Sequence, residues 1–267
     1  MQLENKKITI IGAGNLGLAI TDGLLSSGLL AENSLTITRR KLDGITHYKE
    51  KGITITTDNA AAATTADILI LAVQPHQLAH VAEEISPVMK NKIVVSTITG
   101  VKLPQLVEYF GANNTVVRAM PNTALAVKQS MTCISVTDKA NGGAALVEQI
   151  FGVLGETIII EDELMQAATV LGASGIAFWM RLIRATTQGG IQMGFDAPEA
   201  KKIAVQTCLG AASILNNDDL AHPESEIDKV TTPKGCTISG LNEMEHKGLS
   251  SALIHGLIES YKKINEI

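Results

Sequence analysis

Three glycines near the N-terminus have the spacing of a phosphate-binding turn. In ITIIGAGNLGLAI, Gly12, Gly14 and Gly17 stand between an apolar run and a helical pattern. The first glycine permits a tight turn, the second lets the backbone approach a pyrophosphate, and the third allows helix and strand to pack closely. The N–H groups that begin the helix attract an anion. A lone G-x-G-x-x-G is weak evidence, but this context predicts a dinucleotide site rather than a glycine turn that binds nothing.

Two arginines follow the second predicted strand, SLTIT, where a site for NAD would carry an acidic residue for the ribose 2′-hydroxyl. Arg39 and Arg40 suit a 2′-phosphate instead. A charge-assisted hydrogen bond contributes ~1.5–3 kcal/mol, so one such arginine would favour NADP over NAD by roughly tenfold to hundredfold. We therefore expect NADPH as the cofactor. The alternative is a pair of solvated arginines.

Metal chemistry has little support in the sequence. His76 and His80 are four residues apart after a predicted strand, but no acidic third ligand accompanies them. Cys133, Cys208 and Cys236 are far apart and form no CxxC pair. We expect no metal site, reduced thiols, and a solvated helix start at the two histidines.

Strands and helices alternate through the first 160 residues. Helical spacing predicts helices at 15–28, 77–89, 103–110 and 140–154. Short β-branched runs predict strands at KITIIG, SLTIT, ITITT, DILILAV, KIVVSTI, NTVVRA, MTCISV and ETIIIE. Strands that are apolar throughout are typical of a parallel sheet covered on both faces. Residues 1–160 are thus expected to form a dinucleotide-binding α/β domain with a doubly wound parallel sheet, of the Rossmann type.

No strand-like run occurs after Glu161, so residues 161–267 are expected to form an all-helical substrate and dimerisation domain. Pro198, Pro223 and Pro233 stand where helices could begin or connections turn. TVLGASGIAF and KIAVQTCLGAASIL are apolar on nearly every face, and such helices must be buried. We therefore expect a homodimer through this domain.

Composition excludes several classes of protein. Of the 267 residues, 45% are hydrophobic and 18% charged, which argues against intrinsic disorder. Lys and Arg total 22 against 27 Asp and Glu, with no basic run, so no nucleic-acid partner is expected. The N-terminal MQLENKK leads into an apolar run broken by glycines, which resembles neither a signal peptide nor a membrane span. We expect a cytoplasmic protein with no membrane partner.

Six segments together resemble the pyrroline-5-carboxylate reductase family. They are IGAGNLG, LAVQP, VRAMPNT, TVLGASGIAF, QMGF and VTTPKGCTISGL, in the order and spacing of that family over nearly the whole chain. MPNT and VTTPxGxT are the specific parts. The resemblance implies a Rossmann domain, a helical dimerisation domain whose dimers often assemble further, and the reduction of 1-pyrroline-5-carboxylate to proline with NADPH.

The resemblance also implies roles for individual residues on the cofactor side. The pyrophosphate would contact Gly12, Gly14, Asn15, Leu16 and Gly17, the 2′-phosphate Arg39 with Arg40 beside it, and the adenosine Asn59. Ala72, Val73 and Pro75 would lie along the cofactor, with Met120, Pro121 and Asn122 near the nicotinamide.

On the substrate side, the family's loop matching VTTPKGCT offers backbone N–H groups to the substrate carboxylate, as a nest of amides does. The implied substrate-binding residues are Ser174, Gly175, Lys234, Gly235, Cys236 and Thr237. In the family, the hydroxyl matching Thr237 hydrogen-bonds the ring nitrogen. A protonated cyclic imine already carries its proton, so positioning can suffice and the catalytic Thr237 need not be a strong acid. Its alternative role is the N-cap of the next helix.

The long helix expected to begin at Gly172 contains Arg181 and Arg184 but no lysine. The β-hydroxyacid dehydrogenase relatives of the same architecture place a catalytic lysine on that helix. The absence of lysine therefore argues against their chemistry.

Two segments depart from the family pattern. GASGIA replaces SGSGPA, and TPKGCT replaces SPGGTT. Lys234 could point to solvent, add a cation for the substrate carboxylate, or indicate a reshaped loop if that position needs the positive φ of glycine. Cys236 has no base nearby, so a small buried side chain is favoured over a nucleophile. The departures leave open a reductase of another cyclic imine and a non-catalytic NADP(H)-binding paralogue.

Overall fold

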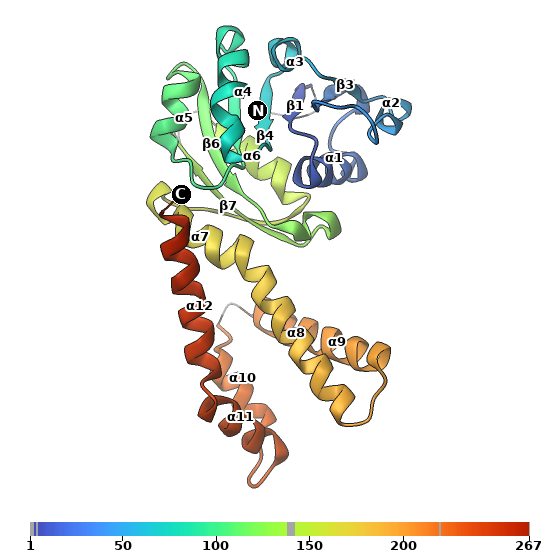
Figure 1. The fold of residues 1–267 in the computed structure, drawn as a ribbon, viewed down its shortest axis with the longest axis vertical. Helices are drawn as coiled ribbons and strands as arrows, with labels where there is room; N and C mark the ends of the chain where they lie inside the picture. Colours follow the sequence, from blue (N-terminus) through green and yellow to red (C-terminus); the bar gives the residue numbers. More distant parts are fainter. Residues whose placement is uncertain (1–2, 4, 138–141, 219, 267) are drawn as a thin grey trace. The chain divides into compact units, whose positions relative to one another are not determined.

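The chain forms two compact units in the computed structural model, which describes residues 3, 5–137, 142–218 and 220–266 (Figure 1). The first unit comprises residues 1–174 together with 261–267, and the second comprises residues 175–260. The expected domain boundary after residue 160 lies inside the first of these units, and the division into functional domains stays a prediction. No helix among the described residues is both long enough and apolar enough to cross a membrane.

The first unit is built on one eight-stranded sheet with the order β3-β2-β1-β4-β5-β6-β7-β8. Its strands are β1 (Ile8–Ile11), β2 (Leu35–Thr38), β3 (Thr54–Thr56), β4 (Ile68–Leu71), β5 (Ile93–Ser96), β6 (Thr115–Met120), β7 (Ser130–Val136) and β8 (Gly155–Ile159). All eight predicted strands are present. Strands β1 to β6 are parallel, but β7 pairs with β6 antiparallel, so the sheet is mostly parallel rather than wholly so.

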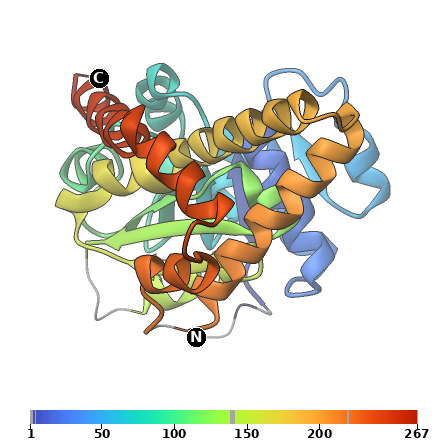
Figure 2. The same cartoon turned by 90° about the horizontal axis from the view of Figure 1, so that it is seen from below.

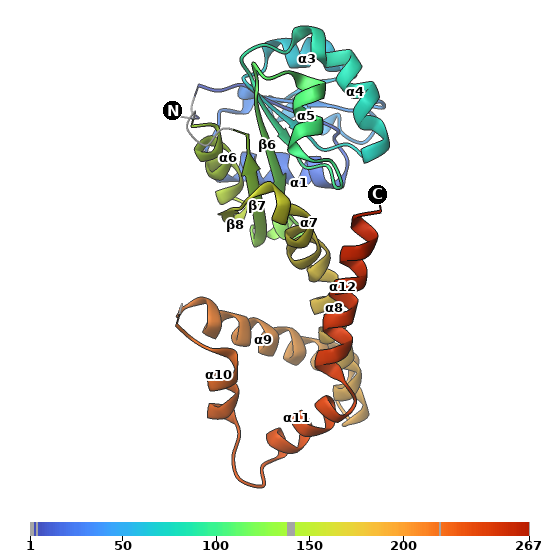
Figure 3. The same cartoon turned by 90° about the vertical axis from the view of Figure 1, so that its left-hand side faces the viewer.

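Helices cover both faces of the sheet, as the apolar strands predict. On one face, α1 (Asn15–Ser27), α2 (His47–Glu50) and α6 (Gly143–Gly152) pack on Ile8, Ile10 and their neighbours. On the other face, α3 (Asn59–Thr65), α4 (Leu78–Ile85) and α5 (Leu103–Phe110) pack on the alternate side chains (Figure 3). The sheet is therefore doubly wound.

Helices α1, α4 and α6 are shorter than the sequence predicted, and α2 and α3 were not predicted. Helix α4 ends at Ile85, after which Ser86–Val88 forms a 3-10 turn. Helix α6 begins at Gly143, and the first two residues of the helix predicted at 140–154 lie outside the described residues. Helices α2 and α3 were not predicted because four and seven residues are too few to show a clear helical period.

A continuous helical segment crosses from the first unit into the second. Helix α7 (Met165–Ala168) passes into a π-helical turn (Thr169–Ser174) and then into α8 (Gly175–Gln192). The expectation that a helix begins at Gly172 is therefore wrong: this glycine lies inside the π-helical turn. Such wide turns are frequent at functional sites.

The described residues of the second unit form helices and connecting turns, with no strand. Helix α8 packs against α9 (Ala197–Asn216), to which it is joined by a short turn at one end (Figure 2). A Cβ on Gly190 would lie 3.0 Å from the Cβ of Ala200, so glycine permits this close crossing. The unit continues with α10 (Pro223–Val230), α11 (Cys236–His246) and most of α12 (Leu249–Ile264).

Large apolar side chains of the second unit are exposed within this chain. Trp179 is 58% exposed, and Met180, Leu209 and Ile254 are similar. The sequence predicts that these apolar helices are buried, but the helices of the second unit do not cover them within one chain.

Candidate functional site

A cavity of about 870 Å³ lies at the carboxyl ends of β1, β2 and β4. Between β1 and β4 the strand order reverses direction, and ligands of open α/β sheets bind at such a point. The turn after β1 is held by Thr38, whose carbonyl accepts hydrogen bonds from the N–H groups of Gly12 and Ala13 at 3.2 and 2.9 Å. The glycine turn thus forms one wall of the cavity.

The three glycines of the turn are explained by three different features of their surroundings. Gly12 has φ +103°, and a Cβ there would lie 2.5 Å from the Ala72 carbonyl oxygen. A Cβ on Gly17 would lie 2.2 Å from the Gly12 carbonyl oxygen, so glycine is needed for the approach of helix α1 to the turn. A Cβ on Gly14 would meet no protein atom within 4 Å. Packing therefore explains Gly12 and Gly17, whereas Gly14 borders open space that a ligand could use.

Three consecutive cations, Arg39, Arg40 and Lys41, line the cavity just after β2. Neither arginine side chain has a hydrogen bond or ion pair with any residue that the structure describes. The Arg39 backbone N–H donates to the Thr56 carbonyl at 3.2 Å, which fixes this chain segment at the cavity edge. Unpaired guanidinium groups beside a phosphate-type turn suit an anionic ligand.

The segment predicted to lie near a nicotinamide contacts the π-helical turn. Asn122 follows β6, and its Nδ2 donates to the Gly172 carbonyl at 3.1 Å. Met120 packs in a small buried cluster against which Ala173 also packs. The Ala173 methyl, where the family has glycine, therefore has apolar neighbours. MPNT and GASG, which are about fifty residues apart in the sequence, are thus brought together.

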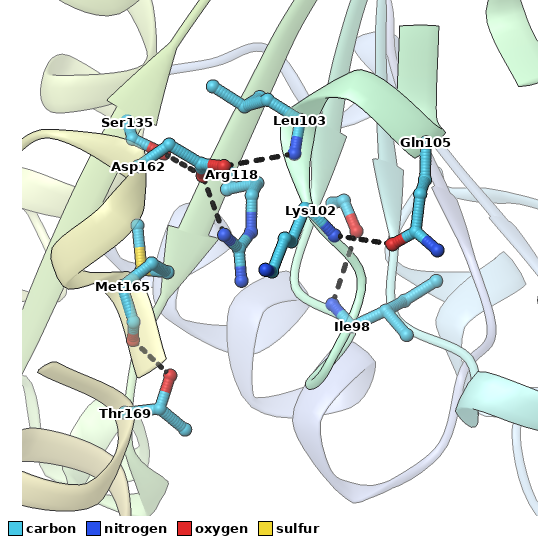
Figure 4. A network of polar contacts seen from close by, with 10 residues as sticks. Ile98, Lys102, Leu103, Gln105, Arg118, Ser135, Asp162, Met165 and Thr169 are labelled. Carbon is cyan, nitrogen blue, oxygen red and sulfur yellow. Dashed lines mark hydrogen bonds and ion pairs between the residues drawn. The ribbon is translucent and has the colours of Figure 1, made fainter. Parts of the chain in front are cut away.

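An ion pair joins Arg118 of β6 to Asp162, just before α7 (Figure 4). Arg118 on β6 is 1% exposed, and its Nη1 lies 2.5 Å from Oδ1 of Asp162, whose side chain is 18% exposed. The same Oδ1 accepts a hydrogen bond from Ser135 on β7 at 3.0 Å, and Oδ2 accepts one from the Leu103 N–H of α5 at 3.2 Å. The Asp162 carboxylate therefore connects β6, β7 and the first residue of α5.

The loop between α10 and α11 contains Lys234 in the left-handed region, with φ +60°. Lys234 thus adopts a backbone conformation that usually favours glycine. The replacement of the family's glycine by lysine has therefore not changed the backbone conformation at this position to one with negative φ. A Cβ on Gly235 would lie 2.5 Å from Oγ1 of Thr232 and 3.0 Å from its carbonyl oxygen, so a side chain there would have to displace Thr232. The expectation that Lys234 could point to solvent agrees with its exposed side chain.

Two expectations for this loop are wrong. Gly235, not Thr237, is the N-cap of α11, because the backbone is extended at Gly235 and already helical from Cys236. Cys236 is exposed rather than buried. The Thr237 hydroxyl is partly buried and makes no hydrogen bond to a described residue.

The structure places the predicted cofactor residues in three positions. Gly12, Gly14, Arg39, Arg40, Asn59, Ala72 and Val73 line the cavity. Asn15, Leu16, Gly17 and Pro75 lie on the adjoining helical turns, while Met120, Pro121 and Asn122 stand at the end of β6. Among the predicted substrate residues, Ser174 belongs to the first unit, and Gly175, Lys234, Gly235, Cys236 and Thr237 belong to the second.

The cavity is also lined by Lys41, Thr57 and Glu84, for which no sequence pattern predicted a role. Lys41 could have been found as the third cation in a row. Glu84 could have been found from its position one helical turn after His80.

His76 and His80 also line the cavity, and no group of three or more His, Cys, Asp or Glu side chains that could hold a metal is found among the described residues. Burial raises the pKa of the Cys133 thiol.

A doubly wound sheet with a glycine turn and a cationic cavity at its switch point defines a dinucleotide-binding protein of the Rossmann class. The family described as pyrroline-5-carboxylate reductase dimerisation matches residues 162–267, and the family of coenzyme F420-dependent NADP oxidoreductases matches residues 7–100. Together with the relatives below, these matches show that the chain belongs to the pyrroline-5-carboxylate reductase family.

Pyrroline-5-carboxylate reductase 2 of Dictyostelium discoideum is 42% identical, over 97% of this chain and 92% of the relative. Pyrroline-5-carboxylate reductase 1 of the same organism is also 42% identical, but this chain spans only half of its length. Among solved structures, a pyrroline-5-carboxylate reductase from Coxiella burnetii is 29% identical with a TM-score of 0.90, covering 98% of both chains. A Plasmodium falciparum pyrroline carboxylate reductase with NADP bound, 22% identical, also has a TM-score of 0.90 and 98% coverage of both chains.

Proposed function

We propose that this protein reduces 1-pyrroline-5-carboxylate to L-proline, with NADPH as the hydride donor. The observation that carries the proposal is the pairing of an open glycine turn with the unpaired cations after β2 in a chain of this family. The NADP oxidoreductase family matched at residues 7–100 supports the choice of cofactor. The cytoplasmic localisation expected from the sequence stays a prediction.

The chain's residues fit an NADPH molecule at several points. The N–H groups at the start of α1 would hold the pyrophosphate above Gly14, where no side chain intrudes. Arg39 and Arg40 would hold the 2′-phosphate, and Asn59 the adenosine. Ala72, Val73 and Pro75 would lie along the cofactor. Asn15 and Leu16 would complete the pyrophosphate turn, and Met120, Pro121 and Asn122 would border the nicotinamide. The cavity lining supports the assignments of Gly14, Arg39, Arg40, Asn59, Ala72 and Val73. The other assignments rest on the family resemblance alone.

For the substrate, the first-turn N–H groups of α11 have no partner inside the helix. We assign these groups, from Cys236 and Thr237 onward, to the substrate carboxylate, with the Gly235 turn shaping the approach. The Thr237 hydroxyl would hydrogen-bond the ring nitrogen, and Ser174 and Gly175 would border the ring. Bound NADPH supplies the hydride for the imine carbon. Thr237 then only orients the imine, because a protonated imine brings its own proton.

We further propose that the protein is a homodimer through its helical unit. The exposed Trp179, Met180 and Leu209 form apolar surface that water disfavours, at roughly 25 cal/mol per Å². A second copy of the chain would cover this surface, and the dimerisation family matched over residues 162–267 supports that occupant. A further assembly of dimers stays a prediction.

NADPH oxidation at 340 nm by the purified protein, with pyrroline-5-carboxylate and separately with a six-membered ring homologue, tests the activity. Turnover with the five-membered ring supports the proposal. Turnover with the homologue alone would assign the chain to another cyclic imine, an outcome that the GASGIA and Lys234 departures would explain. NADPH binding without turnover on either ring would identify a non-catalytic paralogue.

The replacement Arg39→Ala is expected to raise KM for NADPH by roughly tenfold to hundredfold and to leave KM for NADH nearly unchanged. Only NADPH carries the 2′-phosphate, and one charge-assisted hydrogen bond contributes ~1.5–3 kcal/mol. Steady-state kinetics with both cofactors measure the effect, with Arg40→Ala as the matched variant. An equal loss for NADH and NADPH would show that Arg39 does not read the phosphate.

The replacement Lys234→Gly is expected to change KM for the substrate more than kcat. An exposed cation near a carboxylate contributes about 0.2–1 kcal/mol, so KM should rise up to about fivefold. Lys234→Asn, which also tolerates the left-handed conformation but lacks the charge, should behave alike, and Lys234→Arg should retain the wild-type KM. An unchanged KM in the neutral variants would remove the substrate-contact role.

A further inference from the structure

Four polar side chains form a continuous hydrogen-bonded row along the wall of the cavity. The Thr38 hydroxyl, at the end of β2, donates to Oδ1 of Asn59 at 2.6 Å. Nδ2 of Asn59 donates to Oε2 of Glu84 on α4 at 2.6 Å. Nε2 of His80, one turn earlier on α4, lies 3.1 Å from Oε1 of the same carboxylate. All four residues line the cavity.

This row settles which way the Asn59 amide faces. An asparagine side chain has two N–H donors and one carbonyl acceptor. A carboxylate can only accept, so Glu84 must face Nδ2, and the Thr38 hydroxyl then donates to Oδ1. The second N–H of Nδ2 has no partner among the residues that the structure describes. Without Glu84, the amide could turn over and present its carbonyl oxygen where the N–H now lies.

Packing does not require this row. Helices α3 and α4 already contact each other through buried apolar residues, including Ala63, Val81 and Ala82. The Glu84 side chain is 36% exposed, so its carboxylate can be solvated without Asn59. Loss of the Glu84 carboxylate should therefore change the orientation of Asn59 more than it changes folding.

We propose that Glu84 is a positioning residue for the cofactor: it fixes the Asn59 amide with a free N–H toward an oxygen of the adenosine ribose of NADP(H). Thr38 acts on the same amide from the other side. The assignment rests on the proposed function, because it takes NADPH as the ligand. His80 supports the carboxylate and has no contact of its own with Asn59 among the described residues.

The test measures Kd by isothermal titration calorimetry on the full chain, with NADPH, with adenosine 2′,5′-bisphosphate and with reduced nicotinamide mononucleotide. Glu84→Ala is expected to weaken NADPH and the adenosine fragment by the same factor, about tenfold for one lost hydrogen bond, and to leave the nicotinamide fragment unchanged. Glu84→Gln retains an acceptor for Nδ2 and should stay within about threefold of the wild type. Glu83→Ala, at the exposed neighbouring acid on α4, is the matched control.

A double-mutant comparison separates positioning from a direct charge effect. In an Asn59→Ala background, Glu84→Ala is expected to have no further effect, because its partner is already gone. Additive losses would overturn the positioning role, as would tighter NADPH binding by both Glu84 variants, which would indicate repulsion of the phosphates. If Glu84→Ala does not fold, Glu84→Met, which keeps the length of the side chain but removes the acceptor for Nδ2, provides the same test.

Failure of this inference can be told apart from failure of the proposed function. Wild-type protein that binds NADPH and the fragment, with Glu84→Ala indistinguishable from Glu83→Ala, overturns the role of Glu84 alone. Wild-type protein that binds neither ligand overturns the proposed cofactor and this inference with it.

Discussion

The replacement Gly14→Val is expected to weaken NADPH binding by about hundredfold or more while leaving thermal stability unchanged. The backbone at Gly14 has φ −88° and ψ −165°, a conformation that valine adopts readily. A Cβ there meets no protein atom, so folding should not be affected. The valine methyls would instead occupy the space through which a pyrophosphate reaches the N–H groups of the turn.

The magnitude follows from the contacts that would be lost. Hydrogen bonds to a charged group contribute ~1.5–3 kcal/mol each, and the loss of two corresponds to hundredfold or more. Calorimetric Kd values and a thermal melt measure the two effects. Gly152→Ala on α6, also in open space, is the matched control: it should leave NADPH affinity unchanged and should not lower thermal stability, because alanine is favoured over glycine in a helix. NADPH binding by Gly14→Val at wild-type affinity would show that the pyrophosphate lies elsewhere.

The replacement Asp162→Ala is expected to lower the free energy of unfolding by about 3–5 kcal/mol, the usual cost of removing one partner from a buried ion pair. Arg118 would be left charged and almost fully buried, with its Nε already lacking a hydrogen-bond partner among the described residues. Ser135 and the Leu103 N–H would lose their acceptor as well.

The opposite truncation should cost less. In Arg118→Met, the partly exposed Asp162 keeps its hydrogen bonds to Ser135 and Leu103. Urea denaturation at one protein concentration compares the two variants, with Glu163→Ala, at the exposed neighbouring acid, as the control. An Asp162→Ala midpoint equal to that of the control would show that the pair contributes nothing to stability.

Local patterns in the sequence predicted most of the first unit. Eight β-branched runs became eight strands. Inside the sheet, β1 and β4 are buried throughout, as expected for apolar runs in a sheet covered on both faces, whereas the edge strands β3 and β8 are partly exposed and were predicted by β-branched composition alone. Two demands of the glycine turn are local: the positive φ of Gly12, and the clash that a Cβ on Gly17 would have with the Gly12 carbonyl. The further clash of a Gly12 Cβ with the Ala72 carbonyl depends on the neighbouring strand β4 and was not predictable from the turn alone. The place of Arg39 and Arg40 in the cavity was predictable because they come directly after the carboxyl end of β2.

The reversal of β7 and the start of the long helix were not predictable in this way. Strand direction depends on the path of the connection between β6 and β7, and apolar periodicity is the same for either direction. In the π-helical turn at Thr169–Ser174, each hydrogen bond spans one residue more than in an α-helix. A difference of one residue in the helical repeat is too small to be detected in the spacing of apolar side chains.

The sequence by itself determined the class of fold and the position of the glycine turn after β1, because both follow from patterns among residues that are neighbours along the chain. From the cations after β2 it also predicted a site for the 2′-phosphate of NADPH, and that assignment stays a prediction. Only the tertiary structure decided which distant side chains meet. Arg118 and Asp162 are 44 residues apart, and Asn59 and Glu84 are 25 apart. Their contacts depend on strand register and on the rotation of each helix about its axis, which packing of the whole core sets and no local pattern encodes.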